Sequence, residues 1–317
     1  MEGRGRYAAR RLAVAAPTLL GLSLLVFLLG SIAGDPSGII AERGLQPGEV
    51  PTAEQIAAVH HELGLDRPVL VRYGEWLGRA VHGDLGQSLL TGESVTHAIR
   101  GATPSTVGLA GAAIAVVVLL GVPLGLLGAL VERRSGREIL RVGELAGASI
   151  PGFLLAYMLI YLFSVRLKLL PVVSTPGWKG LVLPAITLAI APAAVVARLL
   201  QTSLAGQLGE EYSRTAMAKG LSRSATAASH ALRNALLPVV TVLGGIVARL
   251  IEGAVVVELV FARGGIGSLT LRAVGSADYP MTQGVVLYAG LVVIAFNLLV
   301  DLSYPRLDPR VRLGAAA

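Results

Sequence analysis

The chain has 317 residues, of which 54% are hydrophobic and only 15% charged, whereas a soluble domain carries about 25% charged residues, so the composition indicates an integral membrane protein. Its net charge of +7 comes from basic residues beside apolar runs and not along one polar face, which favours a role in membrane topology over nucleic-acid binding. There is no cysteine, which excludes disulfides and thiolate metal sites.

Six apolar runs are long enough to cross a bilayer, which takes about 20 residues. The first has no charged residue and is too long for a signal peptide, so we expect a retained span. In the second, Thr103 is expected to cap the helix and Pro104 to take its first position. The fifth differs from the others because it contains charged residues. The six expected spans cover residues 12–34, 101–131, 145–165, 180–197, 234–260 and 281–300.

Arginine and lysine are concentrated in the N-terminal segment, in the loops at 132–141 and 198–233, and in the C-terminal tail. With six spans these segments share one side of the membrane, which the positive-inside rule makes cytoplasmic. The sequence therefore predicts an all-α plasma (inner) membrane protein with both termini in the cytoplasm. Its expected divisions are 1–34 with the first span, an extracytoplasmic helical loop at 35–100, and a core at 101–317 that contains a cytoplasmic loop at 205–234.

The extracytoplasmic segment is expected to be folded. Thr52 and Gln55 have the spacing of a capping box, and Gly64 ends the helix that follows. A second helix is expected after Pro68, with apolar residues on one stripe. This part is either a cap packed on the membrane domain or a docking surface for an extracytoplasmic partner, and both can hold. Its candidate docking residues are Tyr73, Trp76 and Asp84.

A polar, basic insert separates the fourth and fifth spans. Residues 210–219 favour a short helix, and Gly220 stands where a left-handed residue would end it, with Leu221 in the following hydrophobic position. Ser222 is expected to cap a second short helix, and Pro238 to mark where that helix meets the fifth span. The pattern by itself is compatible with an interaction surface or with a plain connector.

The stretch EYSRTAMAKGLSRSATAASHALRNALLPVV, within this insert, resembles the cytoplasmic coupling loop of ABC importer permeases, most closely that of the dipeptide, oligopeptide and nickel group. The stretches GLDRPVLVRYGEWL, VVVELVFARGGIGSLTLRAVGSADYP and DLSYPRLDPRVR resemble other parts of the same group, so the resemblance covers nearly the whole chain. It implies that ATPase-coupling residues are Arg214, Thr215, Ala216, Lys219, Gly220, Leu221, Ser222 and Arg223.

The resemblance implies the six-helix fold of a type I ABC importer permease. Its implied partners are a second homologous permease subunit, two cytoplasmic ABC ATPase subunits and an extracytoplasmic substrate-binding protein, assembled in a lipid bilayer. ATP and Mg would be bound by the ATPase subunits, since this chain has no G-x-x-x-x-G-K-[ST] pattern and is expected to bind no cofactor. The implied substrates are di- or oligopeptides, and the alternative is nickel or a metal chelate.

Three charged residues lie within or near the end of the fifth span. A charge at the centre of a helix costs about 2.5–3.5 kcal/mol on insertion scales, so such residues face a bundle interior or a water-filled cavity. Arg249 and Glu252 are three residues apart and can pair along one helix face. Either they form a structural ion pair between subunits or they line the substrate path. The candidate path residues are Arg249, Glu252 and Glu258.

Two function classes compete with the ABC permease. A self-sufficient secondary carrier is expected to show internal repeats, and the sequence has no clear inverted repeat. An enzyme within the membrane needs paired catalytic groups in its spans, which only Arg249 and Glu252 approach. The five histidines have no recognisable ligand spacing, so no metal site is predicted.

Overall fold

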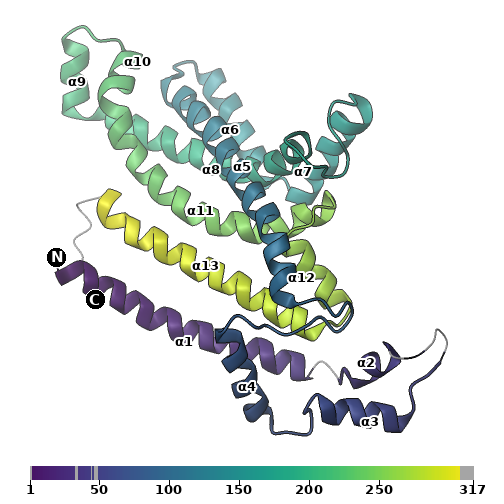
Figure 1. Cartoon of the computed structure of the whole chain (residues 1–317). Helices are drawn as coiled ribbons and strands as arrows, with labels where there is room; N and C mark the ends of the chain where they lie inside the picture. The colour runs from purple at the N-terminus through teal and green to yellow at the C-terminus, as the bar shows by residue number, and fades with distance from the viewer. Residues whose placement is uncertain (1, 33–34, 44, 46–48, 308–317) are drawn as a thin grey trace. The chain divides into compact units, whose positions relative to one another are not determined.

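A computed structural model describes residues 2–32, 35–43, 45 and 49–307, and most of these residues are helical (Figure 1). In this described part there is no strand, and Gln87 and Ser94 form a single isolated bridge. The all-α class is confirmed. The elements are α1 Glu2–Ile32, α2 Ser37–Arg43, α3 Ala53–Glu62, α4 Val69–Val81, α5 Val95–Leu130, α6 Arg134–Ser149, α7 Gly152–Leu159, η1 Ile160–Arg166, α8 Lys179–Gly209, α9 Glu211–Ala218, α10 Arg223–Thr226, η2 Ala227–Ala231, α11 Leu232–Val260, α12 Ile266–Gly275 and α13 Tyr279–Leu307.

Among the described residues, five helical stretches are long and apolar enough to cross a membrane: Ala13–Ile32, Val95–Leu130, Lys179–Gly209, Arg223–Val260 and Tyr279–Val300. A sixth is counted if α6 and the α7–η1 segment, which meet at an angle of 105°, form one bent span. The span expected over 145–165 is therefore sharply bent. Ile150 is extended, with φ −70° and ψ 124°, because Pro151 disfavours a helical residue before it and has no N–H to donate.

The second span also starts earlier than expected. Helix α5 begins at Val95, and Thr103 lies well inside it, where its hydroxyl donates to the Ile99 carbonyl oxygen at 2.7 Å. Thr103 is not an N-cap and Pro104 is not at the first helical position. The hydropathy pattern marked only the apolar part of the helix, whereas its first turns are polar. A proline inside a membrane helix is tolerated because neighbouring groups satisfy the freed backbone oxygen.

The chain forms two compact units. The first comprises residues up to Pro104 and residues 264–295, and its buried cluster joins α5, α12 and α13 through Val95, Ile99, Ile266, Met281 and other apolar residues. In this unit both parts of the capping box predicted at Thr52 and Gln55 are present, and Gly64 has a φ of +62°.

The second unit comprises residues 105–263 and 296–307. Its core is formed largely by α5, α8 and α11. Helices α5 and α8 approach closely through glycines, since a Cβ at Gly125 would lie 2.7 Å from the Ala197 carbonyl oxygen and one at Gly121 would lie 2.9 Å from that of Ala193. Small residues of this kind allow membrane helices to pack backbone against backbone.

Candidate functional site

The predicted helix–Gly–helix hairpin is present between α8 and α11 (Figure 1). Helix α9 ends at Ala218, and Gly220, two residues further on, has a φ of +97°. The Gly220 N–H donates to the Met217 carbonyl oxygen at 3.0 Å, and the Leu221 N–H donates to that of Ala216 at 3.3 Å. This is the Schellman pattern, which requires a left-handed residue where glycine is strain-free. The predicted helix end is confirmed.

The second half of the hairpin is also capped as expected. The Ser222 hydroxyl accepts a hydrogen bond from the Ala225 N–H at 3.2 Å at the start of α10. Residues Ala227–Ala231 then form a π-helical turn, in which the Leu232 N–H reaches back to the Ala227 carbonyl oxygen. Helix α11 continues through Pro238 without a break, so the boundary expected at Pro238 is wrong. The irregularity lies at the π-helical turn, a feature often found at functional positions.

Side chains of α9 bind the hairpin to the end of α8. The Ser213 hydroxyl is fully buried and donates to the Gln207 carbonyl oxygen at 2.8 Å, while the Tyr212 hydroxyl donates to Gln207 Oε1 at 2.7 Å. Ala216 is buried as well. The inward face of α9 is thus occupied by its own chain, and a displacement of the hairpin must act on α8.

The outward face of the hairpin is small and cationic. Of the residues with an expected coupling role, Ala216 is turned inward and Leu221 is half-buried, whereas the others are exposed. Arg223 also reaches the Ala129 carbonyl oxygen at 3.5 Å. The exposed members are Arg214, Thr215, Lys219, Gly220, Ser222 and Arg223.

The three charged residues of α11 that were expected to line the path do not share one environment. Arg249 and Glu252 are both exposed, and within the described chain no ion pair joins them. Their expected pairing along the helix is therefore not observed. Glu258 is fully buried, and its Oε1 accepts a hydrogen bond from the Thr106 hydroxyl at 2.6 Å.

Two of the three candidate docking residues are turned toward their own unit. The rings of Tyr73 and Trp76 lie 5.5 and 5.7 Å from the ring of Phe27 on α1. The Tyr73 hydroxyl is also 2.8 Å from Ser23 Oγ. These residues hold α4 on α1. Only Asp84 is exposed, and its Oδ1 accepts a hydrogen bond from the Gly86 N–H at 2.9 Å.

Sequence reasoning missed Asp278, which is 3% exposed. It accepts hydrogen bonds from the Ser88 hydroxyl, from the Leu89 N–H at 3.1 Å and from the Met281 N–H at 3.3 Å. The same carboxylate therefore caps α13 and ties the loop before α5 to it. The sequence feature that could have identified Asp278 is an acidic residue directly before an apolar span.

Arg263, which follows α11, was missed in the same way. Its Nη1 donates to Ser174 Oγ at 2.9 Å, and its Nη2 donates to the Ser105 carbonyl oxygen at 3.3 Å. The Ser174 N–H in turn donates to the Phe261 carbonyl oxygen at 2.8 Å. One guanidinium thus joins α5, the loop before α8 and the end of α11.

Residues 121–313 match the family described as binding-protein-dependent transport system inner membrane component, and residues 5–110 match the N-terminal part of such membrane components. The chain belongs to this family. It is therefore a permease, a membrane-embedded transport subunit without an ATPase site of its own. Among the described residues of this permease, no group of three or more His, Asp or Glu is placed to hold a metal ion.

Relatives and solved structures agree with this assignment. The permease is 37% identical over 312 residues to a Brucella abortus protein provisionally named a peptide transport system permease, with 96% of this chain and 98% of that protein covered. It is 36% identical over 307 residues to the glutathione transport system permease protein GsiC of Escherichia coli O6:H1, with 96% and 98% covered.

The fold is also found in an inward-facing structure of the MetNI methionine ABC transporter, with a TM-score of 0.56 and 15% identity, over 67% of this chain and 96% of that one. The predicted type I ABC permease fold is confirmed.

Proposed function

We propose that this permease imports di- or oligopeptides, as one of two homologous membrane subunits of an ATP-driven importer. Two cytoplasmic ATPase subunits, which bind ATP and Mg, would seat against the α9–α10 hairpin. An extracytoplasmic binding protein would deliver the peptide to residues 35–100. The names of relatives that align over nearly the whole chain favour peptides over nickel.

The observation that carries this proposal is the construction of the hairpin. Its cationic face is exposed while its inner face is bonded to α8 through Ser213 and Gln207. Closure of the ATPase subunits on ATP would displace the hairpin, and with it α8 and α11. A two-state membrane domain could then change between inward- and outward-facing forms. This arrangement requires the hairpin and both termini to be cytoplasmic, which the basic loops support.

Contact with the ATPase can be tested with single thiols, because the chain has no cysteine. In the assembled complex, Lys219→Cys should form a crosslink to a cysteine placed on the ATPase subunit, and the yield should change when ATP is added. Lys168→Cys, exposed in the loop after η1, is the matched control and should give none. Equal yields from both positions would contradict the proposal.

Substrate class is tested by uptake. Proteoliposomes that contain the full complex and its binding protein should accumulate a labelled tripeptide when ATP is supplied, and should not accumulate a nickel chelate. Nickel uptake without peptide uptake would reverse the assignment.

We also propose that Arg249 and Glu252 line the substrate path, since both are exposed on a helix that is mostly apolar. Replacing both with Gln should alter the KM or rate of uptake while the complex still assembles. Wild-type kinetics in this variant would exclude them from the path. Glu258 is less suited to this role, because it is buried against Thr106.

A further inference from the structure

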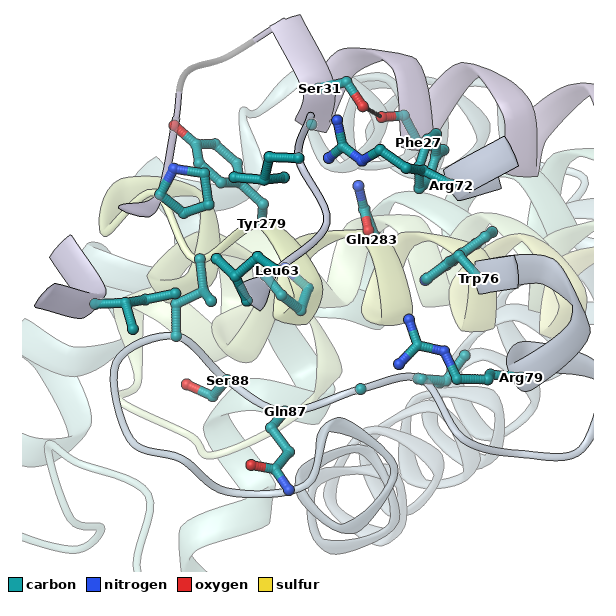
Figure 2. Close-up of a pocket in the computed structure, with 18 of the residues that line it drawn as sticks. Phe27, Ser31, Leu63, Arg72, Trp76, Arg79, Gln87, Ser88, Tyr279 and Gln283 are labelled. Atoms are coloured by element: carbon teal, nitrogen blue, oxygen red, sulfur yellow. Dashed lines mark hydrogen bonds between the residues drawn. The ribbon is translucent and has the colours of Figure 1, made fainter. Parts of the chain in front are cut away.

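The first unit contains a cavity of about 620 Å³, a size within the range of about 300–1,000 Å³ found for small-molecule sites. Its wall is built from the end of α1, the end of α3, one face of α4, the loop before α5 and the start of α13. Figure 2 shows the side chains of Arg72, Trp76, Arg79 and Gln283 around this space.

The face of α4 supplies two guanidinium groups. Arg72 and Arg79 are seven residues apart, with Trp76 between them on the same helical stripe. Neither guanidinium group forms a hydrogen bond or ion pair within the described chain, although that of Arg72 lies 6.0 Å from the centre of the Phe27 ring. Glu75, which also lines the cavity, is held by Arg67 at 2.8 Å. The nearest carboxylate on this helix is thus already paired.

Two uncharged donors lie in the same wall. Gln283 on α13 is 9% exposed, and its side chain makes no hydrogen bond in the part of the chain that the structure describes. Trp76 is 6% exposed, and its buried indole N–H has no acceptor there. A buried donor without an acceptor is rare in native proteins, and one explanation is a bound molecule.

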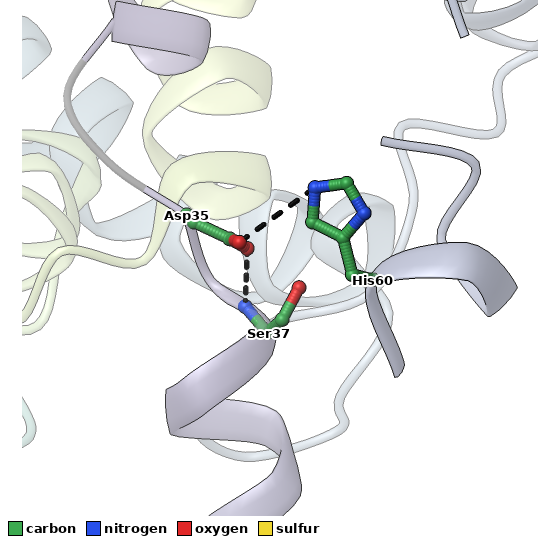
Figure 3. A network of polar contacts seen from close by, with 3 residues as sticks. All are labelled: Asp35, Ser37 and His60. Carbon is green, nitrogen blue, oxygen red and sulfur yellow. Dashed lines mark hydrogen bonds and ion pairs between the residues drawn. The ribbon is translucent and has the colours of Figure 1, made fainter. Parts of the chain in front are cut away.

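A carboxylate of opposite charge belongs to the same cavity. Asp35 accepts a hydrogen bond from the Ser37 N–H at 2.8 Å, and its Oδ2 lies 3.7 Å from His60 Nε2 (Figure 3). Both Asp35 and His60 line the cavity. The cavity therefore offers a carboxylate as well as two guanidinium groups, all with apolar surface from Phe27, Leu63 and Leu65 around them.

We propose that this cavity binds a short zwitterionic peptide, with its terminal carboxylate at Arg72 and Arg79 and its ammonium group at Asp35. Guanidinium groups bind carboxylates through paired, charge-assisted hydrogen bonds, and Gln283 adds a neutral donor. This inference rests on the proposed function, which makes peptides the substrate class. It adds a peptide site on the permease itself, outside the membrane-spanning charges of α11.

Trp76 provides a reporter in the wall of the site. The chain has two tryptophans, so Trp178→Phe leaves Trp76 as the only one. In the full chain reconstituted in lipid nanodiscs, without ATPase or binding protein, trialanine should change the Trp76 fluorescence in a saturable way. Trialanine amide, which lacks the carboxylate, should bind at least about tenfold more weakly.

Variants test the residues. In the Trp178→Phe background, Arg79→Gln should weaken trialanine binding about tenfold or more, and Arg79→Lys should retain part of it because the charge remains. Arg100→Gln, an exposed arginine on α5 outside the cavity, is the matched control and should bind as the parent does. Equal binding of trialanine and its amide, or no effect of Arg79→Gln, would overturn the proposal.

The outcome can be separated from that of the uptake experiment. A complex that imports tripeptides although its permease does not bind trialanine would overturn the cavity inference alone. A permease that binds trialanine in a complex that imports no peptide would overturn the transport assignment and leave the site in place.

Discussion

Helix α5 should not accept a methyl group at Gly125. A Cβ there would lie 2.7 Å from the Ala197 carbonyl oxygen and 2.8 Å from Leu200 Cβ, whereas ordinary contact begins at 3.4 Å. Helices α5 and α8 would have to separate by roughly 0.7 Å, because the nearest atom is the backbone oxygen of Ala197 and not the end of a flexible side chain. A gap of about 0.5–1 Å forfeits a quarter to a half of each dispersion contact. Overpacking of this kind costs about 1–3 kcal/mol.

Gly111 on the same helix is the matched control, because a Cβ there would meet nothing within 4 Å. Both substitutions to Ala gain helix propensity, worth about 0.8–1.0 kcal/mol. The difference between Gly125→Ala and Gly111→Ala therefore isolates the packing cost. We expect Gly125→Ala to unfold several degrees below Gly111→Ala when the full chain is heated in detergent and followed by size-exclusion chromatography. Equal or higher thermal stability of Gly125→Ala would refute the close packing of α5 on α8.

Three further substitutions or conditions follow from local contacts. Asp278→Asn should lower the free energy of unfolding by about 1–3 kcal/mol, because buried backbone and hydroxyl donors lose a charged acceptor; a variant with an unchanged melting temperature would contradict this. Ser222→Ala should remove a cap worth about 1 kcal/mol and speed amide hydrogen exchange in α10, and unchanged exchange would show that the cap is dispensable. Hydrogen bonding from Ser37, followed by the positive charges of His60 and Arg72, lowers the pKa of Asp35 below its ordinary value of 3.8. The ionised Asp35 therefore stabilises the fold fully at any pH above 3.8, and this stabilisation is lost as the pH falls through the lower pKa that Asp35 has in the folded state. Hydrogen-exchange protection of the Ser37 amide, corrected for the intrinsic exchange rate, should stay constant from about pH 7 to pH 5. A loss of protection in that window would contradict the lowered pKa.

The features that could be predicted from the sequence are those decided within about four residues. The capping box at Thr52 and Gln55, the helix end at Gly220 and the cap at Ser222 depend only on neighbours in the chain. Apolar runs located the spans for a similar reason. The first and last residues of the spans were predicted less accurately, because α5 begins in a polar segment that a hydropathy pattern does not mark.

Contacts between residues far apart in the sequence could not be predicted from the sequence. Glu258 and Thr106 are 152 positions apart, and Asp278 and Ser88 are 190 apart. Spacing along one helix says nothing about such partners, so the sequence alone does not distinguish Glu258 from Arg249 and Glu252, although its surroundings differ. The inward turn of Trp76 likewise depends on Phe27 of another helix. A stripe of aromatic residues predicts that a face is covered but does not identify what covers it.

Helix α8 is an uninterrupted rod of 31 residues, which at about 1.5 Å per residue is roughly 46 Å long, slightly more than a whole bilayer with its headgroups. Just before one tip, Ser174 is clamped by Arg263, and just inside the other tip Gln207 is bonded to α9. A push delivered at the α9 end of this helix would therefore reach its other end within a single piece of secondary structure. Such a movement would not have to pass through a series of side-chain contacts. The part of it that reaches the other end depends on how strongly α8 resists bending at Pro184 and Pro192.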